Sequence, residues 1–189
     1  MKIKPVKIGN KFVGPGKPCF FVSEIGINHN GDIKLAKKLI DIAKKAGSDA
    51  VKFQKRSIND LYRAKDLKKY KESPFGKTYG EYRSGVELNY TEYKKINEHC
   101  KKEKILWFAS CWDIKSVDFI EKLNPPCYKI ASACLTNYTL LKYVKTKNKP
   151  IILSTGMSTI KEIDQAVKVV DKKKLIILHC TSAYPPKKE

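Results

Sequence analysis

The feature that most constrains the fold is a regular alternation of short apolar segments with longer segments of helical periodicity. In the longer segments apolar side chains recur every three or four positions, whereas in the short ones they are contiguous and often β-branched. This pattern predicts buried strands separated by amphipathic helices. The six predicted strands are Phe20–Ile25, Ala50–Phe53, Leu106–Ala109, Cys127–Ile130, Ile151–Ser154 and Leu175–His179.

Strands that alternate with helices are usually parallel and joined by right-handed crossovers, so the sequence predicts an α/β domain. Five helices are expected between the six strands. Gly47 is expected to end the first of them, and Thr159 with Glu162 predicts a capping box at the start of the last. The stretch Lys55–Asn89 interrupts this rhythm and predicts a long loop with a functional role, because loops of this length are uncommon in compact domains.

The segment before the first strand carries glycine-containing turns at Gly9–Asn10 and Gly14–Gly16, which predict a short β-hairpin. We therefore expect an N-terminal hairpin at residues 1–19, followed by an α/β domain at residues 20–189. The full length of 189 residues falls short of the roughly 250 that a closed eight-unit α/β barrel typically needs.

The chain is strongly basic, with 39 Lys+Arg against 19 Asp+Glu and a net charge of +20. Such a charge is typical of nucleic-acid-binding domains. The lysines, however, are spread along the chain in pairs and triplets at polar helix positions, and no helix-turn-helix, zinc-finger or aromatic RNA-binding motif accompanies them. We therefore interpret most of the charge as helix surface and expect no nucleic-acid partner.

No apolar run approaches the roughly 18 residues that a membrane span requires, and the N-terminus lacks the apolar region of a signal peptide. These features predict a cytoplasmic protein without a membrane partner. The six cysteines form no C-x-x-C pair, so reduced thiols are expected and a structural zinc site is not.

Polar side chains follow the predicted strands at their carboxyl ends, where α/β proteins bind ligands. Lysines and hydroxyls of this kind suit a small ligand that carries a phosphate and a carboxylate, and a carboxylate among them suits proton transfer. The strand-end residues are Glu24, Lys52, Gln54, Ser110, Lys129, Ser132, Ser154, Thr155, His179, Thr181, Ser182 and Tyr184, with Gly156 following the fifth strand.

Several polar residues in these segments also have a structural interpretation. Lys52 and Lys129 can form salt bridges, and Ser132 and Ser154 can cap helices. His29 can belong to a turn, because Asn30-Gly31 beside it is itself a strong turn signal. The functional interpretation rests on the coincidence of polar donors at the same end of several strands.

Five segments in consistent order resemble the N-acetylneuraminate (sialic acid) synthase family. They are Ser23–Gly31, Val51–Gln54, Tyr128–Ser132, Leu153–Met157 and His179–Pro185. The resemblance implies a (β/α)8 TIM barrel, of which about six βα units are expected here. It also implies condensation of phosphoenolpyruvate with an N-acylated amino sugar, N-acetylmannosamine or a related compound, to give a nonulosonic acid and phosphate.

The resemblance also implies roles for individual residues. Glu24, Lys52 and Lys129 would be catalytic, with Glu24 as acid or base and the lysines holding phosphoenolpyruvate. Ser110, Ser132, Ser154, Gly156 and Ser182 would bind substrate, and Gln54 and Tyr184 would face the sugar. Residues 60–87 would form a lid over the sugar, with Tyr79 and Arg83 as contacts.

Full-length members of the family use a divalent metal, Mn or Mg, bound by two histidines of the seventh and eighth units. The resemblance places these histidines beyond Glu189, so we expect no metal ligand in this chain and no metal bound by it alone. It further implies a homodimer. We therefore expect a fragment with little condensation activity, or alternatively a non-catalytic module that binds phosphoenolpyruvate or a phosphosugar, or a barrel completed by a partner chain.

Three positions depart from the family pattern and leave the acceptor sugar open. Cys134 stands where a glutamate usually binds sugar hydroxyls, Ser182 replaces an asparagine, and the segment Ser110–Asp113 differs from the usual Thr-Pro-Phe. The acceptor can be N-acetylmannosamine, its 6-phosphate, or a legionaminic or pseudaminic acid precursor.

Overall fold

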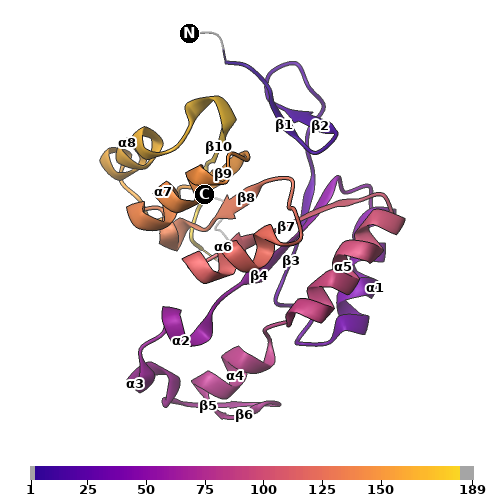
Figure 1. Cartoon of the computed structure of the whole chain (residues 1–189), viewed down its shortest axis with the longest axis vertical. Coiled ribbons are helices and arrows are strands. Elements are labelled where there is room, and N and C mark those ends of the chain that lie inside the picture. Colours follow the sequence, from indigo (N-terminus) through magenta and orange to yellow (C-terminus); the bar gives the residue numbers. More distant parts are fainter. Residues whose placement is uncertain (1–2, 184–189) are drawn as a thin grey trace. The chain divides into compact units, whose positions relative to one another are not determined.

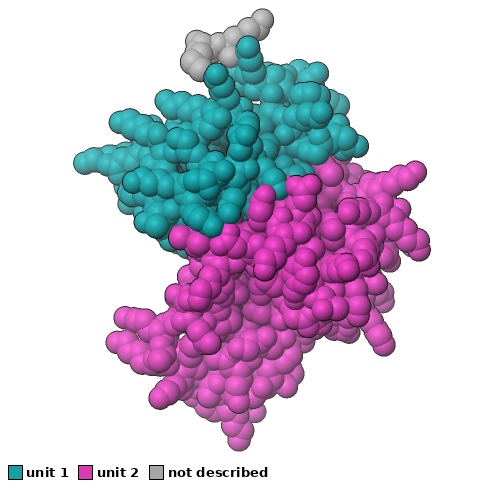
Figure 2. All heavy atoms as spheres, in the orientation of Figure 1, with its two compact units in different colours: residues 1–19, 126–189 teal, residues 20–125 magenta. Residues whose placement is uncertain are grey.

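The computed structural model describes residues 3–183, which form two compact units (Figures 1 and 2). One unit is a single stretch of chain, residues 20–125. Among the described residues, the other combines the N-terminal segment, residues 3–19, with residues 126–183. Both units consist of parallel strands joined by helices, as the alternation in the sequence predicts.

The unit at residues 20–125 contains three parallel strands. These are β3 (Val22–Gly26), β4 (Ala50–Lys55) and β7 (Leu106–Cys111), with β4 paired to both neighbours. The connecting helices are α1 (Ile33–Lys45), α5 (Tyr90–Lys102) and α6 (Ile114–Glu121). The buried ring of Phe53 packs edge-on against Tyr93 and Trp107, with ring centroids 6.1 and 6.3 Å away. This aromatic cluster fixes helix α5 on the strands.

The segment between β4 and α5 folds into short elements, so the expectation of a long loop is wrong. It contains α2 (Ile58–Leu61), α3 (Ala64–Leu67), β5 (Tyr70–Ser73), β6 (Gly76–Thr78) and α4 (Tyr79–Gly85). Strands β5 and β6 pair antiparallel, and Thr78 with Glu81 forms a capping box at the start of α4. None of these elements is long enough to show a clear period in the sequence.

In the second unit, the N-terminal segment forms the predicted hairpin. Strands β1 (Val6–Ile8) and β2 (Lys11–Val13) pair antiparallel, and Ile8 is fully buried. The remainder contains three parallel strands and two helices. These are β8 (Tyr128–Ile130), β9 (Ile151–Ser154), β10 (Leu175–Leu178), α7 (Tyr138–Thr146) and α8 (Ile160–Val169), with short 3₁₀ turns at Ser132–Cys134 and Lys172–Lys174.

The six predicted strands and five predicted helices are therefore confirmed in the described residues, with ends that move by a few positions. The predicted capping box at Thr159 and Glu162 is present. Helix α5 has a capping box that the sequence interpretation missed, formed by Asn89 and Glu92. Among residues 3–183, no helix is both long and apolar enough to cross a membrane.

Candidate functional site

Four of the predicted site residues form one hydrogen-bonded cluster in the unit at residues 20–125. Glu24 on β3 lies beside Lys52 on β4, and Gln54 lies beside Ser110 on β7. Lys52 and Gln54 are two positions apart on one strand, so their side chains leave the same face of the sheet. Strand register alone therefore brings these side chains together.

The cluster is ordered by contacts between oppositely charged and polar groups. Lys52 forms an ion pair with Glu24 and donates a hydrogen bond to the Ser110 hydroxyl, 3.1 Å away. Gln54 donates through Nε2 to Glu24, over 3.2 Å. The Lys52 side chain is 14% exposed and that of Glu24 is 46% exposed. The cluster thus presents a carboxylate to solvent above a largely covered ammonium group.

Arg56, two positions after Gln54, supports this cluster. Its Nη2 donates to Oε1 of Gln54 over 2.5 Å, and its guanidinium lies over the Trp112 ring, 4.2 Å from the centroid. Arg56 is buried. Because Oε1 of Gln54 accepts from Arg56, Nε2 is the group that faces Glu24. Arg56 therefore sets the orientation of the Gln54 amide.

A second cluster lies in the other unit, at the end of β8 and β9. The buried ammonium group of Lys129 donates to the Ser154 hydroxyl and to the Ile130 carbonyl oxygen, each 2.6 Å away. The thiol of Cys180 also donates to Ser154, over 3.2 Å. A lysine in this position supplies fixed positive charge at a strand end.

Ser132, Gly156 and Ser182 lie together beside that lysine cluster in the same unit. The backbone N–H of Gly156 donates to the Ser132 hydroxyl, 3.0 Å away. A Cβ atom at position 156 would come within 2.6 Å of the Ser182 hydroxyl oxygen and within 3.0 Å of that of Ser132. Glycine is therefore required where two hydroxyls approach the backbone this closely.

The sequence predicts one set of strand-end site residues, and the structure groups them within each unit. Glu24, Lys52, Gln54 and Ser110 lie together in the unit at residues 20–125, and Lys129, Ser132, Ser154, Gly156 and Ser182 lie together in the other unit. Tyr184 lies outside the described residues. His179 is exposed beyond the end of β10.

His29 has a structural role in the turn that Asn30-Gly31 predicts. The ring is almost completely buried, and its Nδ1 accepts a hydrogen bond from the N–H of Gly31 over 3.1 Å. Burial lowers the pKa of His29 below its ordinary value, although the nearby Glu92 carboxylate opposes this effect. A neutral imidazole that accepts from the backbone stabilises the turn after β3.

Two residues that depart from the family pattern, Cys134 and Asp113, have side chains that are buried or hydrogen-bonded within the local structure. Cys134 is buried in the 3₁₀ turn after β8. Asp113 is the N-cap of α6, and its carboxylate accepts from the backbone N–H groups of Ser116 and Ser57, each 2.7 Å away. Neither side chain is available to bind a sugar hydroxyl in this arrangement.

The segment expected to form a lid carries an arginine surrounded by tyrosines. Arg83 on α4 donates through Nε to the Tyr79 hydroxyl over 2.7 Å. Its guanidinium lies 4.9 Å from the Tyr79 ring centroid, 5.4 Å from that of Tyr82 and 5.6 Å from that of Tyr62. These contacts hold α4 against α2 and already engage both predicted contact residues.

Comparison with known proteins identifies the family. Residues 39–189 match the sequence profile of the NeuB family. This range includes most of both strand-end clusters. The chain belongs to the NeuB family.

Relatives within the NeuB family cover nearly the whole chain. An uncharacterized protein of Methanocaldococcus jannaschii is 42% identical over 97% of the chain and 52% of its own length. The N-acetylneuraminate-9-phosphate synthase of Mus musculus is 37% identical over 93% of the chain and 50% of its own length. The N,N'-diacetyllegionaminic acid synthase of Campylobacter jejuni is 38% identical over 89% of the chain and 53% of its own length. The chain thus spans about half the length of these relatives.

A solved NeuB-type structure has the same fold. The N-acetylneuraminic acid (sialic acid) synthetase of Leptospira borgpetersenii, in complex with citrate, superimposes with a TM-score of 0.83 at 31% identity. The match covers 98% of this chain and 62% of the solved one. The α/β fold of TIM-barrel type with an N-terminal hairpin is therefore confirmed.

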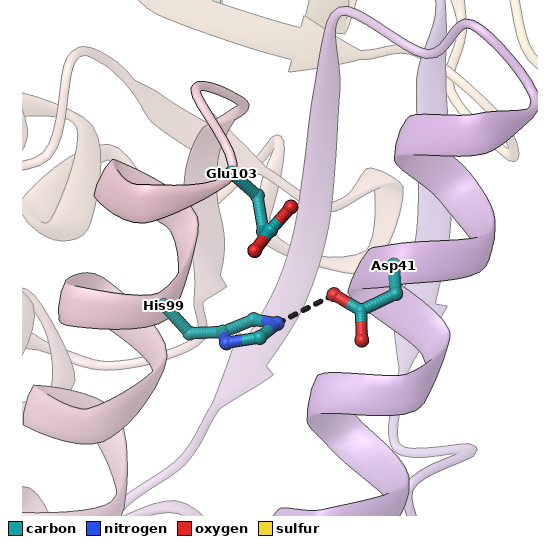
Figure 3. A group of neighbouring side chains, drawn as sticks. All are labelled: Asp41, His99 and Glu103. Atoms are coloured by element: carbon teal, nitrogen blue, oxygen red, sulfur yellow. Dashed lines mark hydrogen bonds and ion pairs between the residues drawn. The ribbon is translucent and has the colours of Figure 1, made fainter.

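Sialic acid synthases are generally metal-dependent, so a set of metal ligands is of interest here. Among residues 3–183, the single group of three or more His, Cys, Asp or Glu side chains with suitably close ligand atoms is Asp41, His99 and Glu103 (Figure 3). These residues lie on or just after helices α1 and α5, away from the strand ends. The strand-end clusters described here therefore contain no metal site of their own.

Sequence reasoning missed Arg56, Glu87 and the group of Asp41, His99 and Glu103. Arg56 follows the second predicted strand and Glu87 lies between helices α4 and α5, where no pattern marked them. The Asp41, His99 and Glu103 group was missed because its members come from distant segments. A His-x-x-x-Glu spacing within a predicted helix was the one signal available for it, since residues four apart share a helix face.

Proposed function

We propose that the chain is part of a sialic-acid-type synthase, which condenses phosphoenolpyruvate with an N-acylated amino sugar to give a nonulosonic acid and phosphate. The observation that carries this proposal is the buried Lys129, whose ammonium group is fixed on Ser154 at the carboxyl ends of β8 and β9. Membership in the NeuB family supports the same assignment.

In this proposal each cluster, taken by itself, supplies groups that suit an anionic part of phosphoenolpyruvate. Lys129, with Ser132, Ser154 and the Gly156 turn, supplies positive charge and hydrogen-bond donors for one anionic group, and Ser182 beside the turn adds a hydroxyl. Lys52 and Ser110 likewise supply a positive charge and a hydroxyl that suit an anionic group. Gly156 lets the backbone N–H come close to a bound oxygen because no side chain intervenes.

Glu24 is the proposed acid or base at the reacting carbons. The enol carbon of phosphoenolpyruvate attacks the aldehyde carbon of the open-chain sugar, water then adds at C2, and phosphate leaves. Addition of water releases a proton that a carboxylate can accept. Glu24 is partly exposed and held by Lys52 and Gln54, which places an ionised carboxylate in contact with solvent at the strand end.

The proposed acceptor is an N-acylated amino sugar, N-acetylmannosamine or a related compound, and Gln54 and Tyr184 are the proposed sugar contacts. The N-acetylneuraminate-9-phosphate synthase and the N,N'-diacetyllegionaminic acid synthase are 37% and 38% identical in sequence to this chain. Sequence identity therefore does not favour one acceptor sugar over the other. The segment 60–87, with Tyr79 and Arg83, remains the proposed lid.

A divalent metal, Mn or Mg, is proposed for the complete synthase, where it would polarise the aldehyde oxygen. Because the strand-end clusters of residues 3–183 lack a ligand set, we expect the 189-residue chain to bind phosphoenolpyruvate with little turnover. The cytoplasm is the proposed compartment and a homodimer the proposed assembly. A hairpin at residues 1–19 and a barrel domain at residues 20–189 remain the proposed division.

The proposal is tested by measuring phosphoenolpyruvate binding to the purified 189-residue chain by calorimetry. The variant Lys129→Met is expected to weaken binding at least tenfold, because it removes a fixed charge from the anion site. The variant Lys142→Met, on the exposed face of α7, is the matched control and is expected to bind normally. Equal affinity in the wild type and in Lys129→Met would contradict the proposed site.

A second candidate function is a module that binds phosphoenolpyruvate or a phosphosugar without catalysis. This function is favoured because, among residues 3–183, the strand ends carry residues suited to an anion but no set of metal ligands. Phosphate release from phosphoenolpyruvate, N-acetylmannosamine and Mn²⁺ distinguishes the two. Turnover that is lost in Lys129→Met supports the synthase. The module is supported if a chain that completes the barrel binds phosphoenolpyruvate through Lys129 but releases no phosphate.

A further inference from the structure

The side chains of Asp41, His99 and Glu103 converge between helices α1 and α5 (Figure 3). His99 and Glu103 are four positions apart, so they share one face of helix α5 and its end. Asp41 reaches them from α1, and its Oδ1 lies 2.6 Å from Nε2 of His99. One ligand atom from each residue can be chosen so that all lie within 4.8 Å of one another.

The charge balance of this group is unusual for the chain. The sequence has about twice as many basic as acidic side chains, 39 against 19. Yet within residues 3–183 neither Asp41 nor Glu103 forms an ion pair with a lysine or arginine, and Asp41 instead contacts the His99 ring. Two carboxylates that face one another without such a partner repel, and a bound cation would remove that repulsion.

We propose that Asp41, His99 and Glu103 bind a divalent transition-metal ion of the Zn²⁺ class. One imidazole nitrogen and two carboxylate oxygens are ligands that zinc accepts, and an imidazole disfavours Mg²⁺ and Ca²⁺, which prefer oxygen ligands alone. Ligands at zinc distances lie about 3.3 Å apart in a tetrahedron. Small side-chain rotations from the observed spacing therefore suffice, with water as the fourth ligand.

The site lies at the end of this unit opposite to the proposed catalytic cluster. Helices α1 and α5 run back from the carboxyl ends of the strands, so their last turns lie near the start of β4 and β7. Lys44 near the end of α1 donates to the carbonyl oxygen of Lys104, 3.1 Å away, which ties these two helix ends together. The amino ends of strands in such folds serve stability rather than chemistry. The metal therefore joins α1 to α5 and has no part in condensation.

The experiment measures Zn²⁺ binding to the purified chain by calorimetry and thermal unfolding. One equivalent of tight binding is expected, and a hundredfold excess over the dissociation constant should raise the unfolding midpoint by about 5–10 °C. Excess Mg²⁺ should not compete. No binding, or equal competition by Mg²⁺, would overturn the proposal.

Matched variants locate the bound ion. Glu103→Gln removes a ligand but leaves the contact between His99 and Asp41 in place, and it should weaken Zn²⁺ binding at least tenfold. Glu98→Gln makes the same chemical change at an exposed position of α5 and should have no effect. His99→Gln should also abolish the response, whereas His179→Gln should not. Binding that survives in Glu103→Gln and His99→Gln would place the ion elsewhere and overturn the proposal.

Discussion

Glu24 and Lys52 form an ion pair between direct neighbours in the register of β3 and β4. In the proposed site Lys52 binds an anionic group of the substrate, so the Glu24 carboxylate competes for that lysine and also repels the ligand. The variant Glu24→Gln is therefore expected to tighten phosphoenolpyruvate binding by about fivefold, corresponding to roughly 1 kcal/mol for one charge at this range. Calorimetric titration measures the change.

The same variant has a clear control and a clear contrary result. Glu98→Gln removes one negative charge from the exposed face of α5 and should leave the affinity unchanged. Weaker binding in Glu24→Gln would mean that Glu24 orders the site more than it opposes the ligand.

Glu87 neutralises two buried cations, and its loss should be costly. Its Oε2 accepts from Lys55 Nζ, 2.9 Å away, and from the backbone N–H of Arg56 over 3.3 Å. Glu87→Gln leaves both cations buried without this carboxylate and should lower the free energy of unfolding by about 3–5 kcal/mol. Urea unfolding measured by tryptophan fluorescence reports this unit, because Trp107 and Trp112 both belong to it.

A double variant separates charge from packing in that region. Combining Glu87→Gln with Lys55→Met should recover part of the lost stability, since one uncompensated buried charge is removed. A loss below 1 kcal/mol in Glu87→Gln alone would show that water already screens these groups.

Stability should fall in mild acid because of His29. Burial lowers the pKa of the folded imidazole, so the unfolded state binds more protons once the pH falls below the ordinary value of 6.5. The loss begins near pH 6.5, continues down to the lowered folded pKa, and has a slope of at most about 1.4 kcal/mol per pH unit. Urea unfolding between pH 5 and 8 measures it.

His29→Asn tests the assignment of that slope. In the wild type the Gly31 N–H donates to His29 Nδ1. The side-chain oxygen of an asparagine can accept the same hydrogen bond, but asparagine does not titrate. The variant should therefore lose this contribution to the slope, whereas His179→Asn, at an exposed position, should keep it. An unchanged slope in His29→Asn would assign the acid sensitivity to other groups.

The capping box of α5 should contribute measurably to stability. Asn89 Oδ1 accepts from the N–H of Glu92 over 3.0 Å, and Glu92 Oε2 accepts from the N–H of Asn89 over 2.8 Å. Asn89→Ala should lower the free energy of unfolding by about 1 kcal/mol, whereas Asn89→Ser should retain most of it. Equal losses in both variants would show that the side-chain cap is not responsible.

The sequence was most informative where hydrophobic runs are long and least informative where elements are short. The strand Ile151–Ser154 was predictable from a short contiguous apolar run, and Ala50–Lys55 from β-branched and aromatic residues that alternate with Lys52 and Gln54. The elements between residues 58 and 85 were not, since a four-residue helix such as Ala64–Leu67 covers barely one turn.

The candidate site shows the same division. Lys52, Gln54 and Ser110 were predictable because strand ends converge in every parallel α/β fold. Arg56 was not, because its contact with the Gln54 amide depends on side-chain packing around Trp112. The contact between Asp41 and His99 joins residues 58 positions apart through the packing of two helices, which no local pattern encodes.

The division of the chain into one continuous and one split unit has a consequence for biosynthesis. Residues 20–125 form a unit from one continuous stretch of chain, so its helices and strands can begin to pack while later residues are still being translated. The hairpin at Val6–Val13 cannot finish so early, because β1 contacts the turn at Lys172–Lys174. Contacts this far apart in sequence form slowly. The hairpin is therefore completed after residues 20–125 can pack, although it precedes them in the chain.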